Sequence, residues 1–220
     1  MAVQSREAAS IELGGTELFL QGNRTVFCPA ESTLFVADLH LGKGSAFRAG
    51  SIPVPSGSTQ RTLDRLCQAV TSVDARRIVI LGDMWHAKSG RTEASERAFL
   101  EWRDRHAERD VWLVEGNHDL KSGLIPESHR TTVLPPGSAL GAFTLLHEPG
   151  KGHGYALAGH IHPAVRLVGR ADQSVVAPCF WVQSDCMVLP AFGEFTGAAR
   201  VRPSATDRVF VVVEGWVREV

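Results

Sequence analysis

Five short apolar runs in this chain each end directly at residue types that bind metal ions. The residues that follow these runs are Asp38 with His40, Asp83, Asn117, His147, and His160 with His162. In α/β proteins, buried strands fix the backbone, and their carboxyl ends open into a crevice where ligands bind. The pattern therefore predicts strands that end around one shared polar site.

Glycine stands directly before three of these residues, at Gly82, Gly116 and Gly159. Glycine permits unusual backbone angles and close approach of neighbouring backbone. Residues two apart in extended chain point to the same side, so Asp38 is expected to converge with His40, and His160 with His162.

The donor atoms in this set are oxygen and nitrogen, without thiolates, which suits Mn, Fe, Zn or a similar divalent ion. Seven ligands are too many for one ion, whereas two ions about 3.5–4 Å apart that share a carboxylate would use them well. A single histidine after a strand is more often a satisfied buried residue than a ligand. Five such coincidences are harder to explain that way, because clustered buried polar groups need partners.

The composition is that of a soluble globular chain. It has 220 residues, of which 44% are apolar and 21% charged, and we expect one domain over residues 1–220. The net charge is −1, so any contact with nucleic acid must come from a local basic patch or from metal ions.

The sequence also bears on location. No apolar stretch approaches the ~20 residues that span a bilayer, and residues 1–10 lack the apolar core of a secretory signal. The four cysteines form no CxxC pair. We therefore expect a cytoplasmic chain with reduced thiols.

Periodicity predicts a β-α-β-α-β first half and a mostly β second half. The expected helices are 59–73, with Ser58 as N-cap, and 93–109, with Thr92 as N-cap; residues 42–58 are expected to form a loop. The expected strands are 17–21, 25–28, 33–37, 78–81, 111–114, 131–134, 143–146, 155–158, 165–168, 175–177, 180–182, 187–189 and 210–213. Two sheets packed on each other with helices outside would bury these segments.

The polar segments, taken in chain order, resemble the motifs of the calcineurin-like metallophosphoesterase superfamily. These motifs are D-x-H, G-D-x-x-[DH], G-N-H-[DE], a lone H, and G-H-x-H. They correspond here to 38–40, 82–86, 116–119, His147 and 159–162. The resemblance spans about residues 34–163 and implies a four-layer αββα sandwich of two mixed β-sheets flanked by helices.

The same resemblance implies roles for individual residues. One metal ion would be held by Asp38, His40, Asp83 and His162. The other would be held by Asp83, Asn117, His147 and His160, with Asp83 shared. His118 would contact the scissile phosphate and protonate the leaving oxygen, and Asp119 would orient His118.

A narrower resemblance extends over most of the chain. The first motif continues through Lys43, Phe47-Arg48 and 52–55, and the segment 189–197 reads LPAFGEFTG. Both segments are similar to the bacterial ligase-associated DNA damage response endonucleases, the PdeM-type branch. That likeness implies a manganese-dependent phosphodiesterase acting on single-stranded DNA, in functional association with a DNA ligase, a helicase and an exonuclease-like protein.

Other residues have weaker predicted roles. Lys43, Arg48 and His86 are candidate substrate-binding residues, with a solvated loop as the alternative for the first two. His106 and His129 lack a motif and are expected on the surface or in packing. The loop 150–154 is expected near the mouth of the site. The five tryptophans are expected mainly in the core, although they offer surfaces for base stacking.

The motifs leave alternatives open. A phosphoesterase acting on nucleotides or other small esters would carry the same ligands. A catalytically silent scaffold would usually have lost a ligand or the GNH histidine, and none is missing here. A two-metal hydrolase of another type would begin with an HxHxDH motif, whereas HxH comes late in this chain.

Overall fold

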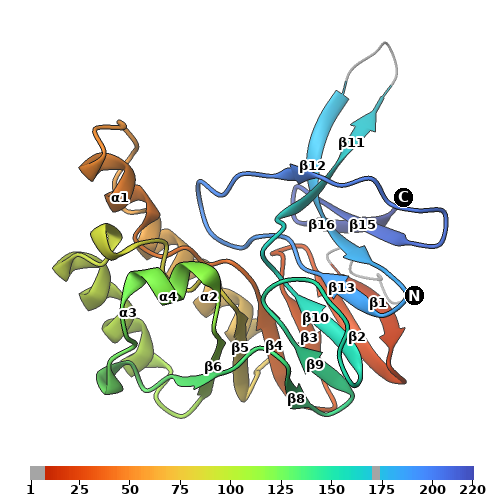
Figure 1. The fold of residues 1–220 in the computed structure, drawn as a ribbon, viewed down its shortest axis with the longest axis horizontal. Helices are drawn as coiled ribbons and strands as arrows, with labels where there is room; N and C mark the ends of the chain where they lie inside the picture. Colours follow the sequence, from red (N-terminus) through yellow and green to blue (C-terminus); the bar gives the residue numbers. More distant parts are fainter. Residues whose placement is uncertain (1–7, 170–173) are drawn as a thin grey trace.

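The computed structural model describes residues 8–169 and 174–220 (Figure 1). Its first sheet has seven strands whose order follows the chain. They are β1 (Ala8–Leu13), β2 (Thr16–Gln21), β3 (Val26–Cys28), β4 (Thr33–Val36), β5 (Arg77–Leu81), β6 (Asp110–Val114) and β7 (Thr132–Leu134). Neighbours from β1 to β4 are antiparallel, and those from β4 to β7 are parallel. The parallel half therefore places the ends of β4, β5 and β6 at one edge.

The helices lie between the strands of this parallel half or follow them. They are α1 (Lys43–Ala49), α2 (Ser58–Ser72), η1 (Lys88–Gly90), α3 (Glu93–Arg105), α4 (Asn117–Ser122) and η2 (Glu127–His129). Side chains such as Leu66 of α2 and Phe99 of α3 pack with Ile80 of β5 in one buried cluster. Burial of this apolar surface fixes both long helices on the sheet.

Both long helices were predicted, and their ends differ in instructive ways. Thr92 caps α3 as expected, since its side chain accepts a hydrogen bond from the Ser95 amide. Ser58 was wrong as an N-cap, because α2 begins at that residue and Gly57 occupies the cap position in left-handed geometry. A short helix, α1, forms within the predicted loop 42–58.

The second sheet contains nine strands. They are β8 (Ser138–Leu140), β9 (Phe143–Leu145), β10 (Tyr155–Ala158), β11 (Pro163–Val168), β12 (Ser174–Val182), β13 (Cys186–Val188), β14 (Ala199–Arg200), β15 (Arg208–Val213) and β16 (Trp216–Glu219). The order is β14-β11-β12-β13-β10-β9-β8, with β15 pairing to β12 and β16. The predicted strands 175–177 and 180–182 are parts of the single strand β12.

The two sheets pack face to face. Phe35 of the first sheet meets Phe143 of the second edge to face, with ring centroids 6.1 Å apart. Leu81, Phe180 and Met187 belong to the same buried cluster. The predicted sandwich of two mixed sheets flanked by helices is confirmed.

The flanking helices are few and are distributed unevenly around the two sheets. Within the described ranges every helix precedes β7, and the helices gather on one side of the molecule, at the left in Figure 1. The outer face of the second sheet carries small buried side chains such as Ala156, Ala158 and Cys186, packed by Leu146 and Trp181. Such small side chains offer little apolar area against which a helix would pack.

Among the described helices, none is long and apolar enough to cross a membrane. The expectation that residues 1–10 form no secretory signal falls mostly outside the described residues. All four cysteines are free thiols, as expected.

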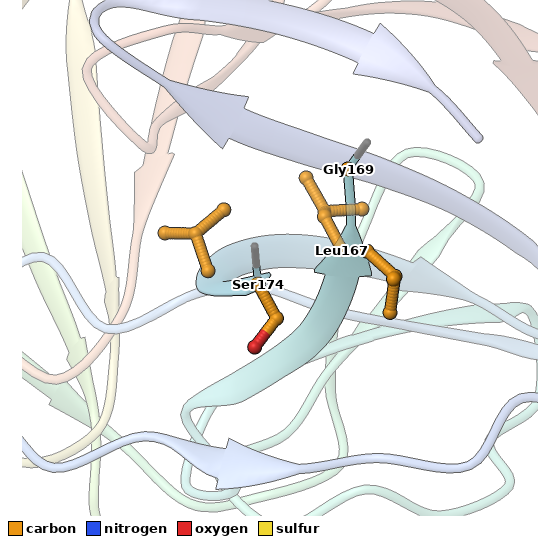
Figure 2. A pocket seen from close by; sticks show the side chains of 5 residues that line it. Leu167, Gly169 and Ser174 are labelled. Carbon is orange, nitrogen blue, oxygen red and sulfur yellow. The ribbon is translucent and has the colours of Figure 1, made fainter. Parts of the chain in front are cut away.

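A recess at the ends of β11 and β12 is lined by Leu167, Val168, Gly169, Ser174 and Val175 (Figure 2). It contains no predicted site residue.

Candidate metal centre

The two sheets bring all seven predicted ligands to one place. From the first sheet, these side chains follow β4, β5 and β6; from the second, they follow β9 and β10. The residues gathered in this way are Asp38, His40, Asp83, Asn117, His147, His160 and His162. The site is therefore built from strand ends of both sheets, as the sequence pattern predicts.

One group consists of Asp38, His40 and His162, whose donor atoms all lie within 4.8 Å of one another. Nε2 of His162 is 3.6 Å from Oδ1 of Asp38 and 3.3 Å from Nε2 of His40. Asp38 is fully buried. Three donor groups thus surround one point, and one of these donors is a buried carboxylate.

A second group consists of Asp83, His147 and His160, again within 4.8 Å of one another. Nε2 of His147 is 3.4 Å from Oδ1 of Asp83, 3.1 Å from Nδ1 of His160 and 2.9 Å from Oδ1 of Asn117. Asn117 therefore joins this group through its amide oxygen.

Asp83 lies between the two groups. Its Oδ1 faces His147 at 3.4 Å, and its Oδ2 is 3.8 Å from Nε2 of His40. One carboxylate thus presents one oxygen to each group, which is the arrangement that a bridging ligand requires.

The hydrogen bonds of the histidines test whether cations fit here. Nδ1 of His147 donates to the Leu81 carbonyl at 3.0 Å, and Nδ1 of His162 donates to the Gly197 carbonyl at 3.1 Å. Each Nε2 therefore carries a lone pair. These lone pairs face carboxylate and amide oxygens, and such mutually repelling acceptors need a cation between them. The donor set fits a pair of divalent ions.

Burial sets the protonation of His40. It lowers the pKa of His40 to about 2, with nearby Lys43 and neighbouring histidines adding to the effect. The ring is therefore neutral at physiological pH. A metal-binding histidine must be deprotonated at the donor nitrogen, so the electrostatics favour a ligand role.

The backbone at these residues is unusual. Asp38, His40, Asp83, His160 and His162 all have positive φ, between 45° and 69°. The expectation that residues two apart converge because the chain is extended was wrong; they converge in left-handed conformations after the strands end. For residues other than glycine this conformation costs roughly 1–2 kcal/mol each, and such strain clusters at functional sites.

Two of the glycines permit the close packing that the sequence predicts. A Cβ at Gly82, where φ is +82°, would overlap the imidazole ring of His147. A Cβ at Gly116 would lie 2.5 Å from the amide nitrogen and Oδ1 of Asp83. Any larger residue at either position would displace a candidate ligand.

His118 lies beside the metal centre, but the group that orients its ring is not the predicted Asp119. Its Nδ1 donates to the backbone carbonyl of His86 at 2.6 Å, and its amide donates to Oδ1 of Asp83 at 2.9 Å. Nε2 is 3.9 Å from Oδ2 of Asp83. The free nitrogen of the ring therefore faces the two ligand groups.

Asp119 does not contact the His118 ring, so its predicted orienting role is corrected. Its carboxylate accepts hydrogen bonds from the amides of Gly116 and Trp85, each at 3.1 Å. Burial raises the pKa of Asp119 to about 6. This residue instead fixes the start of α4 and the backbone that leads into His86.

Two of the three candidate substrate-binding residues lie beside the metal centre, and the third does not. Lys43 is half-buried, and burial lowers its pKa while Asp38 and Asp83 attract its charge. His86 stacks on His118, with ring centroids 4.9 Å apart, and burial lowers its pKa to about 4. Arg48 instead donates to the Pro55 carbonyl and to Ser45 Oγ, which holds its own loop together.

Three backbone carbonyls orient the histidines and could not be recognised from the sequence. They belong to Leu81, His86 and Gly197. Gly197 lies in the segment 189–197, which belongs to the narrower family resemblance but had no predicted role. A carbonyl has no side-chain signature, so only the fold reveals these contacts. His106 and His129 are both buried packing residues.

Two packed mixed sheets with paired ligand groups at their strand ends are the architecture of a metallophosphoesterase. The nuclease MPE of Pseudomonas putida is 34% identical, with a TM-score of 0.84, and the match covers 96% of this chain and 100% of that one. The phosphoesterase Yfce of E. coli is 13% identical over 86% of this chain and 97% of its own, with a TM-score of 0.44. No protein-family model and no curated protein matches. The chain belongs to the metallophosphoesterase family, alongside the Pseudomonas putida nuclease.

Proposed function

We propose that this protein is a phosphodiesterase with two divalent metal ions, manganese in the cell, and that it cleaves single-stranded DNA as an endonuclease in DNA repair. The observation that carries the proposal is Asp83, whose two carboxylate oxygens face separate ligand groups beside His118. The 34% identical relative is a nuclease, which supports a nucleic acid as the substrate, and the choice of single-stranded DNA rests on the family resemblance.

The candidate ligands have distinct parts in this proposal. Asp38, His40 and His162 hold one ion, while Asn117, His147 and His160 hold the other, with Asp83 between them. When bound, the ions withdraw charge from the phosphate and acidify water.

His118 acts as the proton donor. Its Nδ1 donates to the His86 carbonyl, so in the protonated ring the Nε2 nitrogen is the one that gives its proton to the leaving oxygen, which leaves the ring neutral. Asp119 supports this geometry through the amides of Gly116 and Trp85. Lys43 contributes positive charge for the phosphate, and His86 lines the same site as a neutral ring stacked on His118. Arg48 has only a structural role.

The test compares hydrolysis of single-stranded DNA, duplex DNA, bis-p-nitrophenyl phosphate and p-nitrophenyl phosphate with each divalent metal. We expect manganese to support the highest activity, and single-stranded DNA and bis-p-nitrophenyl phosphate to be preferred over the monoester. Preference for the monoester, or hydrolysis of bis-p-nitrophenyl phosphate without hydrolysis of either DNA, would favour the small-ester alternative. Absence of hydrolysis with every metal would favour the silent scaffold.

A variant separates the proton donor from the metal ions. His118→Asn should lower kcat by about 100-fold or more while the rise in Tm on adding manganese persists. Exposed His153 provides the matched control, and His153→Asn should leave both quantities unchanged. Undiminished turnover in His118→Asn would remove this residue from the mechanism.

Cytoplasmic location and association with a DNA ligase, a helicase and an exonuclease-like protein stay predictions from the family resemblance.

A further inference from the structure

A pocket of about 530 Å³ adjoins the second ligand group. It lies on the outer face of the second sheet, where no described helix covers the strands. The loop after β9, the pair His160-Ile161 and the hairpin of β12 and β13 line it. His160 thus belongs both to the pocket and to the candidate metal centre.

The pocket has a rigid aromatic wall. Trp181 of β12 is half-buried and packs against the small side chains of Ala156, Ala158 and Cys186. Its indole N–H donates to Oδ2 of Asp207 at 2.8 Å. The ring is therefore held in one orientation, and of the small residues against which it packs Cys186 also lines the pocket.

The charges around the pocket disfavour a second phosphate. Lys151 and Asp185 form an ion pair at 3.2 Å, which leaves the exposed carboxylate of Glu148 as the unbalanced charge. A phosphate group would be repelled by that carboxylate. A neutral, flat and partly apolar group would not, and its volume would fit a pocket of this size.

We propose that this pocket is a nucleobase subsite, which seats the base of a nucleotide next to the scissile phosphate against Trp181. This inference rests on the proposed function, because a strand whose phosphate lies at the metal centre passes His160. Bases stack on aromatic side chains irrespective of sequence, and only unpaired bases expose their faces. The subsite would favour single-stranded over duplex DNA.

Gly150 offers a way to fill the pocket without disturbing the fold. It lines the pocket, its φ is not positive, and an added Cβ would meet only ordinary contacts, the closest at 3.6 Å to Leu146 Cδ1. Gly150→Phe should lower kcat/KM for single-stranded DNA by about tenfold or more, mainly through KM. It should leave hydrolysis of an abasic single strand of the same length, which has no base to place in the pocket, within about twofold. His153→Phe is the control, because exposed His153 lies in the same loop but does not line the pocket.

A binding measurement needs no turnover. In two-dimensional NMR spectra, titration with deoxyadenosine should shift the Trp181 indole N–H peak, which is assigned by its disappearance in Trp181→Phe. Gly150→Phe should abolish the shift, and His153→Phe should retain it. An unmoved indole peak, or equal loss of activity on both substrates in Gly150→Phe, would overturn the subsite. If the wild type hydrolysed no diester, the proposed function would fall, while this titration would still decide the subsite.

Discussion

Asp119 distinguishes the family expectation from the observed geometry. If Asp119 oriented His118, Asp119→Asn would spoil catalysis without disturbing the fold. In the structure, its carboxylate instead accepts two buried backbone hydrogen bonds at 3.1 Å, from Gly116 and Trp85. The asparagine side chain keeps one acceptor oxygen but presents an N–H₂ group where the second amide needs an acceptor.

The magnitude follows from those two bonds. Hydrogen bonds to a charged group contribute about 1.5–3 kcal/mol each, and one of the two is lost, so Asp119→Asn should cost about 2 kcal/mol. For a chain of this size that corresponds to a fall in Tm of roughly 4–8 °C. Asp119→Ala leaves both amides without a partner and should cost about twice as much.

The assay combines urea unfolding with kcat for bis-p-nitrophenyl phosphate at pH 8, where Asp119 is ionised because its raised pKa is about 6. We expect kcat per folded molecule to stay within about threefold, since His118 Nδ1 is held by the His86 carbonyl and not by Asp119. An unchanged Tm combined with a fall in kcat of about 100-fold would refute this reasoning.

Three further predictions follow from particular contacts. Gly82→Ala should abolish the rise in Tm on adding manganese, because its Cβ overlaps the His147 ring, whereas Gly137→Ala, where nothing lies within 4 Å, should retain it. Arg91→Lys should lower the free energy of unfolding in urea by about 2 kcal/mol, because the guanidinium donates to three carbonyls at the end of α4. Arg97 forms only an exposed ion pair with Glu93, so the control Arg97→Lys should lower it by under about 0.5 kcal/mol. Burial, and to a smaller extent nearby arginines, lower the pKa of His106 in the folded protein. Its contribution to the stability of the fold is therefore complete above the ordinary pKa near 6.5, and it is lost as the pH falls through the lowered pKa of the folded state. His106→Phe should therefore reduce the loss of Tm between pH 7 and pH 5, and an unchanged loss would contradict this.

Much of the fold was predictable because its determinants are local. The apolar stripes of α2 and α3 and the short runs of the strands specify their elements through periodicity alone. The helix α1 escaped prediction because a helix of seven residues has little stability of its own. It is held by contacts outside the helix, such as the amide of Gly42, which donates to Oγ1 of Thr59 in α2.

The sequence by itself determined which residues gather at the site, because each candidate ligand directly follows a strand and strand order carries it to a common edge. Only the tertiary structure decided how they are held. The partner of His118 is a backbone carbonyl, the ligands adopt left-handed conformations, and the second sheet stays uncovered beside Trp181. The physical reason is that side-chain type is written in the sequence, whereas carbonyl directions and open surfaces arise only when distant segments pack together.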